Sequence, residues 1–250
     1  MPECALVEGW NAAVRLAMIV VSKEQREAMM RELRALAWAV IAFTLSTPGW
    51  SAEDPLQGDL RDLRVGMQVG ELPAEGYVNL ACGNDGAEPG LDLAGWADFE
   101  RCPADAAGLH EIAFEYDESL QPWAAVSDKW EGTQVAGHPV IPSLLIDDQG
   151  VVQRIRIVTD PDVRLYLKKK AFLLPIRVMG RYGRDDWVCV DAEPGEGRAA
   201  VGGMFIDRHC EKTFHDRRLV METRLYRTAK QSGQEFTGST RLEIINAGAG

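Results

Sequence analysis

Residues 143–183 constrain the fold of this 250-residue chain more than any other stretch. Two apolar segments, residues 143–146 and 151–158, flank the sequence Asp147-Asp148-Gln149-Gly150. Asp and Gly form tight turns between strands, so the pattern predicts an antiparallel hairpin. The same four residues offer oxygen ligands for calcium, but they lack the further acids and the final Glu of an EF-hand loop. A plain turn is the favoured interpretation.

The segment after the hairpin predicts one basic amphipathic helix that ends near Arg181. Asp160 can cap it, with Pro161 at its first position. Pro175 predicts a kink or a brief break of the helix, and Gly183 is a natural stop. One apolar stripe at helical spacing is formed by Val163, Leu167, Ala171, Leu174 and Val178.

Charge is distributed unevenly along the chain. Residues 52–150 carry 20 acidic and 4 basic side chains, whereas residues 151–184 carry 9 basic and 2 acidic ones. The net charge of the whole chain is −11, which argues against nucleic acid as a partner of the surface. The basic segment is therefore the feature that most suggests a function.

Two interpretations of this basic segment stay open. It can bind an anionic surface, either a protein or an anionic component of the cell envelope. Alternatively, the helix lies against the acidic part of the chain and its charges are neutralised internally or solvated. The candidate partner-binding residues are Arg164, Lys168, Lys169 and Lys170.

The N-terminal region has the layout of a secretory signal peptide, which we assign to residues 1–51. Arg31 and Arg34 precede an apolar run at residues 35–45, and small residues follow it. The run has 11 residues, whereas a membrane-spanning helix needs about 20. We expect a periplasmic or secreted protein with no stable membrane span after processing. The true start is then Met29 or Met30.

Four cysteines remain after residue 51, and an even number in an exported chain favours disulfides. Landmarks around them repeat: Cys82 and Cys189 are 107 residues apart, Cys102 and Cys210 108, Tyr116 and Tyr226 110, and Gly132 and Gly238 106. A duplication explains the similar offsets, although β-rich chains also repeat such residues by chance. It predicts the disulfides Cys82–Cys102 and Cys189–Cys210, each contributing about 3 kcal/mol.

Residues whose side chains could act in catalysis or bind a metal give only weak indications of a functional site. His110 lies beside Glu111 and Glu115 and can act as an acid–base group, but strand alternation places it with apolar neighbours, as expected for a core histidine. His209, Cys210 and His215 offer metal ligands together with Cys189, although a Cys189–Cys210 disulfide is favoured. We therefore expect no cofactor and no metal.

These patterns predict an α+β fold with a mostly antiparallel sheet. Two similar disulfide-bearing halves, residues 52–140 and 184–250, are linked by a central hairpin and basic amphipathic helix at residues 141–183. The predicted function is a non-enzymatic, exported soluble binding or accessory module that meets another macromolecule in the cell envelope. The alternative is a periplasmic hydrolase whose site, with His110, lies between the two halves.

Overall fold

The computed structural model describes residues 58–117, 119, 133–232 and 234–248. The chain divides into two compact units, residues 1–55 and 56–250, and all described residues belong to the second. The signal peptide predicted at residues 1–51, with its alternative starts, lies outside the described residues and stays a prediction. None of the described helices has the length and apolar composition that a membrane crossing requires.

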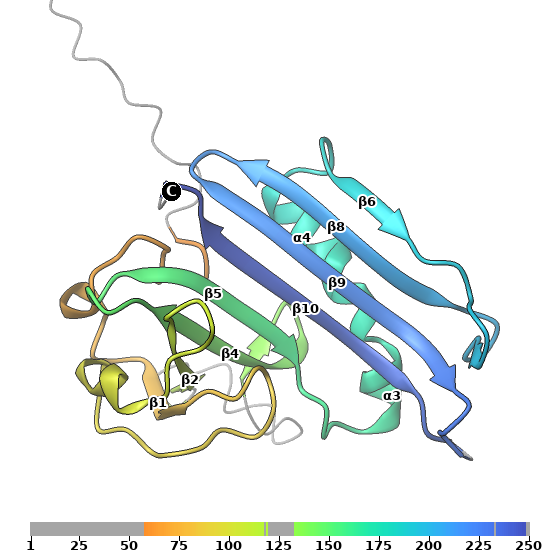
Figure 1. The fold of residues 1–250 in the computed structure, drawn as a ribbon, viewed down its shortest axis with the longest axis horizontal. Coiled ribbons are helices and arrows are strands. Elements are labelled where there is room, and N and C mark those ends of the chain that lie inside the picture. The colour runs from red at the N-terminus through yellow and green to blue at the C-terminus, as the bar shows by residue number, and fades with distance from the viewer. Residues whose placement is uncertain (1–57, 118, 120–132, 233, 249–250) are drawn as a thin grey trace, which may run out of the picture. The chain divides into compact units, whose positions relative to one another are not determined.

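An antiparallel sheet dominates the described unit (Figure 1). Eight strands follow one another in the order β1-β2-β4-β5-β10-β9-β8-β6, and the short strands β3 and β7 pair with β4 and β9. The strands are β1 Tyr77–Cys82, β2 His110–Tyr116, β3 Gln134–Val135, β4 His138–Ile146, β5 Val152–Thr159, β6 Val188–Asp191, β7 Arg198–Ala199, β8 Ile206–Phe214, β9 Arg217–Thr228 and β10 Thr237–Asn246. The predicted sheet-rich antiparallel fold is confirmed.

The predicted hairpin is formed by β4 and β5, which lie in the middle of the strand order. Asp147 shapes its turn, because its carboxylate accepts hydrogen bonds from the N–H groups of Gln149 (3.0 Å) and Val151 (2.9 Å). Gly150 has a φ of 76°, a conformation that favours glycine. The Asp147 carboxylate is thus engaged by the turn itself, as the plain-turn interpretation expects.

The single basic helix is not confirmed, because the segment forms three short helices. They are α3 (Leu165–Lys169), the 3-10 helix η5 (Ala171–Leu173) and α4 (Leu174–Tyr182). The expectation that Asp160 caps the helix is wrong: Arg164 precedes α3, and Asp160 instead accepts a hydrogen bond from the N–H of Asp162 (2.8 Å). Pro175 lies in the first turn of α4, where its missing N–H breaks no helical bond. Gly183, with a φ of 84°, ends α4.

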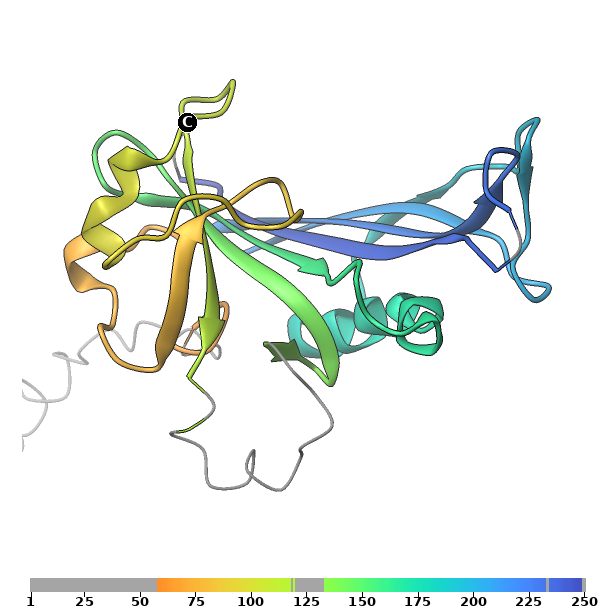
Figure 2. The ribbon, with the colours of Figure 1, turned by 90° about the horizontal axis from the view of Figure 1, so that it is seen from below.

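The helices lie against one face of the sheet (Figure 2), which we call the helix face. Strand alternation decides which residues meet them. Leu219 and Met221 of β9 and Leu242 of β10 are buried in one apolar core with Leu174 and Val178 of α4. The residues between them along each strand point to the other face, which we call the open face.

An aromatic cluster fills the same core near β1 and β2. Tyr77, Trp96, Phe114 and Tyr116 meet in edge-on or tilted contacts, with ring centroids 5.3 to 6.1 Å apart. Trp96 begins the 3-10 helix η2 (Trp96–Arg101), and its indole N–H donates to the carbonyl of Pro73 (2.9 Å). A further 3-10 turn, η1 (Val69–Glu71), precedes β1.

Both predicted disulfides are present, but their surroundings differ. Cys82–Cys102 joins the end of β1 to the residue after η2, whereas Cys189–Cys210 joins directly opposed residues of β6 and β8. All strands that carry or flank them belong to one continuous sheet. The division into two similar halves is therefore not confirmed and stays a prediction.

Candidate functional site

The helical segment carries seven basic side chains with no salt bridge to any acidic group in the described part of the chain. They lie at the surface, fully or half exposed. We call them the basic layer: Arg164, Lys168, Lys169, Lys170, Arg177, Arg181 and Arg184. All four predicted partner-binding residues belong to it.

The hydrogen bonds that the basic layer does make go to neutral oxygens. Lys168 donates to the carbonyl of Pro161 (3.5 Å), and Lys170 donates to the hydroxyl of Tyr166. Arg181 donates to the carbonyl of Gly58. Such bonds orient the side chains but leave their positive charges uncancelled.

Apolar side chains are exposed among these bases. Leu165 and Tyr166 on α3 and Ile176 on α4 are among the most exposed large hydrophobic residues of the described chain. The ammonium group of Lys170 lies 4.0 Å from the centroid of the Tyr166 ring. The surface therefore offers positive charge and apolar contact area together.

His138, at the start of β4, responds to the field of the basic layer. Its side chain is buried, and burial together with the nearby charges of Lys170 and Arg177 lowers its pKa. A neutral imidazole next to two cations avoids a third positive charge. The positive potential of the layer thus reaches into the sheet.

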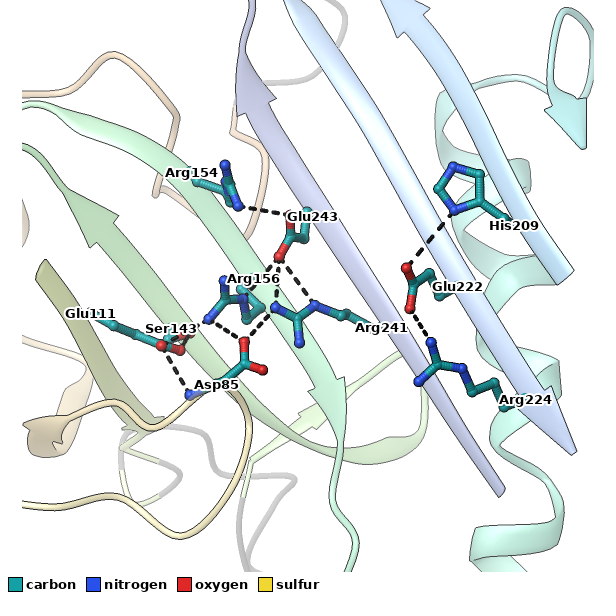
Figure 3. Close-up of polar contacts among 10 residues, drawn as sticks. All are labelled: Asp85, Glu111, Ser143, Arg154, Arg156, His209, Glu222, Arg224, Arg241 and Glu243. Carbon is teal, nitrogen blue, oxygen red and sulfur yellow. Dashed lines mark hydrogen bonds and ion pairs between the residues drawn. The ribbon is translucent and has the colours of Figure 1, made fainter. Parts of the chain in front are cut away.

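The open face carries a second charged cluster, in which acids and bases alternate (Figure 3). Arg156 on β5 is its centre, with a side chain that is 6% exposed. It donates to Glu111 of β2 (2.8 Å) and to Glu243 of β10 (3.0 Å) and lies 3.0 Å from Asp85. Ser143 of β4 donates a further bond to Glu111 (2.6 Å). We call this group the arginine–carboxylate cluster.

Two more arginines complete the cluster around Glu243. Arg154 donates to it at 3.0 Å and Arg241 at 2.9 Å, while Arg241 also donates to Asp85. Burial alone would raise the pKa of Glu243, but Arg154, Arg241 and Arg156 hold it below the ordinary value. The hydrogen bond from Arg241 likewise lowers the pKa of Asp85. The cluster is therefore an internally paired ionic network.

Further ion pairs continue across the outer strands of the open face. Glu222 of β9 accepts a hydrogen bond from Arg224 (2.8 Å) and lies 3.9 Å from His209 of β8 (Figure 3). Glu211 accepts from Arg218 (2.8 Å) and contacts the other ring nitrogen of His209 (2.9 Å). These exposed pairs contribute little to folding stability, about 0 to 1 kcal/mol each.

His110, the residue named for the hydrolase alternative, has a hydrogen-bond partner at each ring nitrogen. Its Nδ1 bonds to the carbonyl of Cys102 (2.6 Å) and its Nε2 to the carboxylate of Asp148 (3.1 Å). The hydrogen bond to the carbonyl of Cys102 raises the pKa of His110. Burial acts against this rise, and Asp148 adds to it. Its ring also packs edge-on against Phe99. Both ring nitrogens of His110 therefore have partners within the described chain.

Two of the residues considered as metal ligands form a disulfide. Cys189 and Cys210 are bonded to each other, so neither can act as a thiolate. No group of three or more His, Cys, Asp or Glu side chains among the described residues is arranged to hold a metal ion.

The sequence analysis missed the arginine–carboxylate cluster. Arg154 and Arg156 are two residues apart on β5, as are Arg241 and Glu243 on β10, so each pair points to one face. This spacing indicates two charged side chains on one face of each strand. It does not indicate that β5 and β10 are neighbours, because Glu243 lies 87 residues from Arg156 in the sequence.

Comparisons with known proteins identify no relative of this chain. No protein-family model matches the sequence, and neither a curated protein nor a solved structure matches it significantly. Fold and site define this chain as an antiparallel sheet protein with two disulfides and a basic helical surface that forms no salt bridge within the described residues.

Proposed function

We propose that this chain is a non-enzymatic binding or accessory module that meets an anionic macromolecule through the basic layer. The observation that supports the proposal most directly is the absence of ion pairs at these seven bases within the described residues. Exposed like charges repel one another, so their clustering costs free energy in the isolated molecule. An anionic partner relieves this repulsion.

The alternative of internal neutralisation has less support. It expects the bases to pair with the acidic residues of the first part of the chain. Those described acids of that part that form ion pairs form them with other bases. Glu111 and Asp85 pair with Arg156, and Asp98 pairs with Arg101. The exposed Leu165, Tyr166 and Ile176 also fit a contact surface better than a solvated face.

The proposed setting is outside the cytoplasm, in the periplasm or secreted. Two disulfides support this setting, since such bonds persist in oxidising compartments. The predicted signal peptide agrees with it. A protein or an anionic envelope component is the expected partner, and nucleic acid is not.

The test compares two triple variants with equal loss of charge. In one, Lys168, Lys169 and Lys170 are replaced by Gln. In the matched control, exposed bases of β8 and β9 that already form ion pairs are replaced: Arg208→Gln, Arg218→Gln and Arg224→Gln. Binding to poly-glutamate and to anionic lipid vesicles is measured at low and high salt for both variants and the unchanged protein.

We expect the lysine variant alone to bind more weakly and with a flatter salt dependence, because the positive patch steers association. A benzophenone cross-linker placed at Tyr166 in the native cell envelope should then capture an anionic macromolecule. Equal weakening by both variants would mean that only net charge matters and would refute the basic layer as the binding surface.

A further inference from the structure

The two ends of the sheet differ in how their outer edges are covered. At one end, β1 is paired with its own following loop: Cys82 N–H donates to the carbonyl of Leu91 and Leu93 N–H to that of Leu80, both at 2.8 Å. At the other end, β6 pairs with β8, and no described residue pairs with its outer side. An uncovered edge strand is a template for another strand.

The backbone groups on the outer side of β6 can be assigned. The Cα atoms of Cys189 and Cys210 are 4.1 Å apart, which marks a pair without mutual backbone hydrogen bonds. The bond from Ala192 N–H to the carbonyl of Asp207 (2.7 Å) fixes the same alternation. The N–H and C=O groups of Cys189 and Asp191 therefore point away from β8, and no hydrogen bond within the described chain reaches them.

The side chains beside this edge are apolar and open to solvent. Val188 is 71% exposed and Val190 is 64% exposed, both on the open face. They line a groove of about 520 Å³ together with His209, Glu211 and Thr213 of β8. Alternate side chains of an added strand would pack beside the two valines.

Acidic residues flank the edge on both sides. Residues 184–196 hold five acids and one base. Four of the acids are exposed and make no side-chain ion pair in the described structure: Asp185, Asp186, Glu193 and Glu196. An incoming segment with basic residues at its ends complements this charge.

A second copy of this chain fits the edge poorly. Antiparallel pairing of two copies about Cys189 brings each Val188 opposite the other copy's Val190, but it also brings together the acidic segments that flank β6 in both copies. Like charges opposed across two strands are destabilising. The edge therefore favours a different polypeptide.

We propose that β6 accepts an extended strand from another polypeptide, with apolar side chains at alternate positions and Lys or Arg at both ends. Main-chain hydrogen bonds to Cys189 and Asp191 supply affinity, and the valines and flanking acids supply selectivity. Its contacts are main-chain groups of β6 and not the lysines of the basic layer, so the two binding activities can be tested separately.

The test uses the end-blocked peptide Lys-Val-Thr-Val-Thr-Val-Lys as the probe, with Glu-Val-Thr-Val-Thr-Val-Glu as its charge control. Amide hydrogen exchange is followed by NMR on the full chain. We expect the basic peptide to slow exchange at Cys189 and Asp191. The amides of Val188 and Val190 already face β8 and should change little.

Two variants isolate the backbone contact. Asp191→Pro removes an outward N–H without removing a β6–β8 bond, and edge strands accept proline at such positions. Asp191→Asn is the matched control, since both variants lose the ion pair with Arg208 but Asn keeps the N–H. We expect Asp191→Pro to weaken binding of the basic peptide about tenfold relative to Asp191→Asn.

Three results would overturn the proposal. Equal affinity of both variants would exclude the main-chain contact, and equal affinity of both peptides would exclude the charge selection. A dimer of the unliganded chain that Asp191→Pro dissociates, seen by analytical ultracentrifugation, would assign the edge to a second copy instead.

Discussion

The arginine–carboxylate cluster and the basic layer lie on opposite faces of one sheet. The two differ in whether their positive charges are paired with carboxylates. In the cluster, Arg154, Arg156 and Arg241 each contact a carboxylate, and Arg156 is almost fully buried. In the basic layer, exposed bases of one sign stand side by side without an acid. The first arrangement is suited to holding strands together, and the second is suited to meeting another molecule.

The difference follows from how each group is assembled. The cluster joins strands that are far apart in the sequence, with 45 residues between Glu111 and Arg156 and 87 between Arg156 and Glu243. The basic layer comes from one continuous segment, residues 164–184, that contains no acidic residue. Burial makes pairing obligatory in the cluster, because an unpaired buried charge is costly. Exposure imposes no such requirement on the basic layer.

The largest expected effect comes from removing the buried base of the cluster. Arg156→Met leaves the part-buried Glu111 and Glu243 without their shared partner, so the free energy of unfolding should fall by about 3–5 kcal/mol. Arg177→Met in the basic layer should change it by no more than about 0.5 kcal/mol. Urea unfolding at pH 7 measures both, and similar losses would erase the contrast between the two regions.

The cluster should also make stability depend on acid pH. The pKa of Glu243 is lower in the folded protein than its ordinary value, because the surrounding arginines outweigh burial. Its ionised form therefore stabilises the fold above the ordinary Glu pKa of about 4.3, and this contribution is lost as the pH falls through the folded value. Urea unfolding from pH 7 to pH 3 should show the loss. Glu243→Gln should flatten the curve in this window, whereas exposed Glu193→Gln should not.

A smaller effect is expected for the basic layer. Replacing Lys168, Lys169 and Lys170 by Gln should leave the thermal midpoint nearly unchanged at high salt and raise it slightly at low salt, since repulsion among like charges is reduced. Thermal unfolding in 10 mM and 500 mM NaCl provides the measurement. A clear loss of stability at low salt would restore the interpretation that these lysines neutralise acids within the chain.

The smallest expected effect is a shift of one titration. Lys170→Gln should raise the pKa of His138 toward its ordinary value, because one of the cations that lower it is removed. Lys212→Gln, remote in the strand order, is the control. An NMR titration of the His138 ring proton reports the change. An unchanged His138 pKa would mean that Lys170 does not contribute to its depression, which burial and Arg177 would then account for.

The sequence by itself determined the local features of this protein. The turn at Asp147 and Gly150 predicted the central hairpin, and alternation predicted β2 with Ile112 and Phe114 on its buried side. The cysteine spacing predicted both disulfides correctly. Such features succeed because neighbouring residues decide them, through turn geometry, side-chain period and loop closure.

The tertiary structure decided the rest. The predicted long helix became three short ones, since the start set by Arg164 and the proline in α4 suit separate helices packed on the sheet. The pairing of β5 with β10 brought Arg156 to Glu243, a contact between residues that share no local pattern. The same strand order left β6 at an open edge. Strand order depends on the sum of many long-range contacts, and the sequence around any one residue does not encode it.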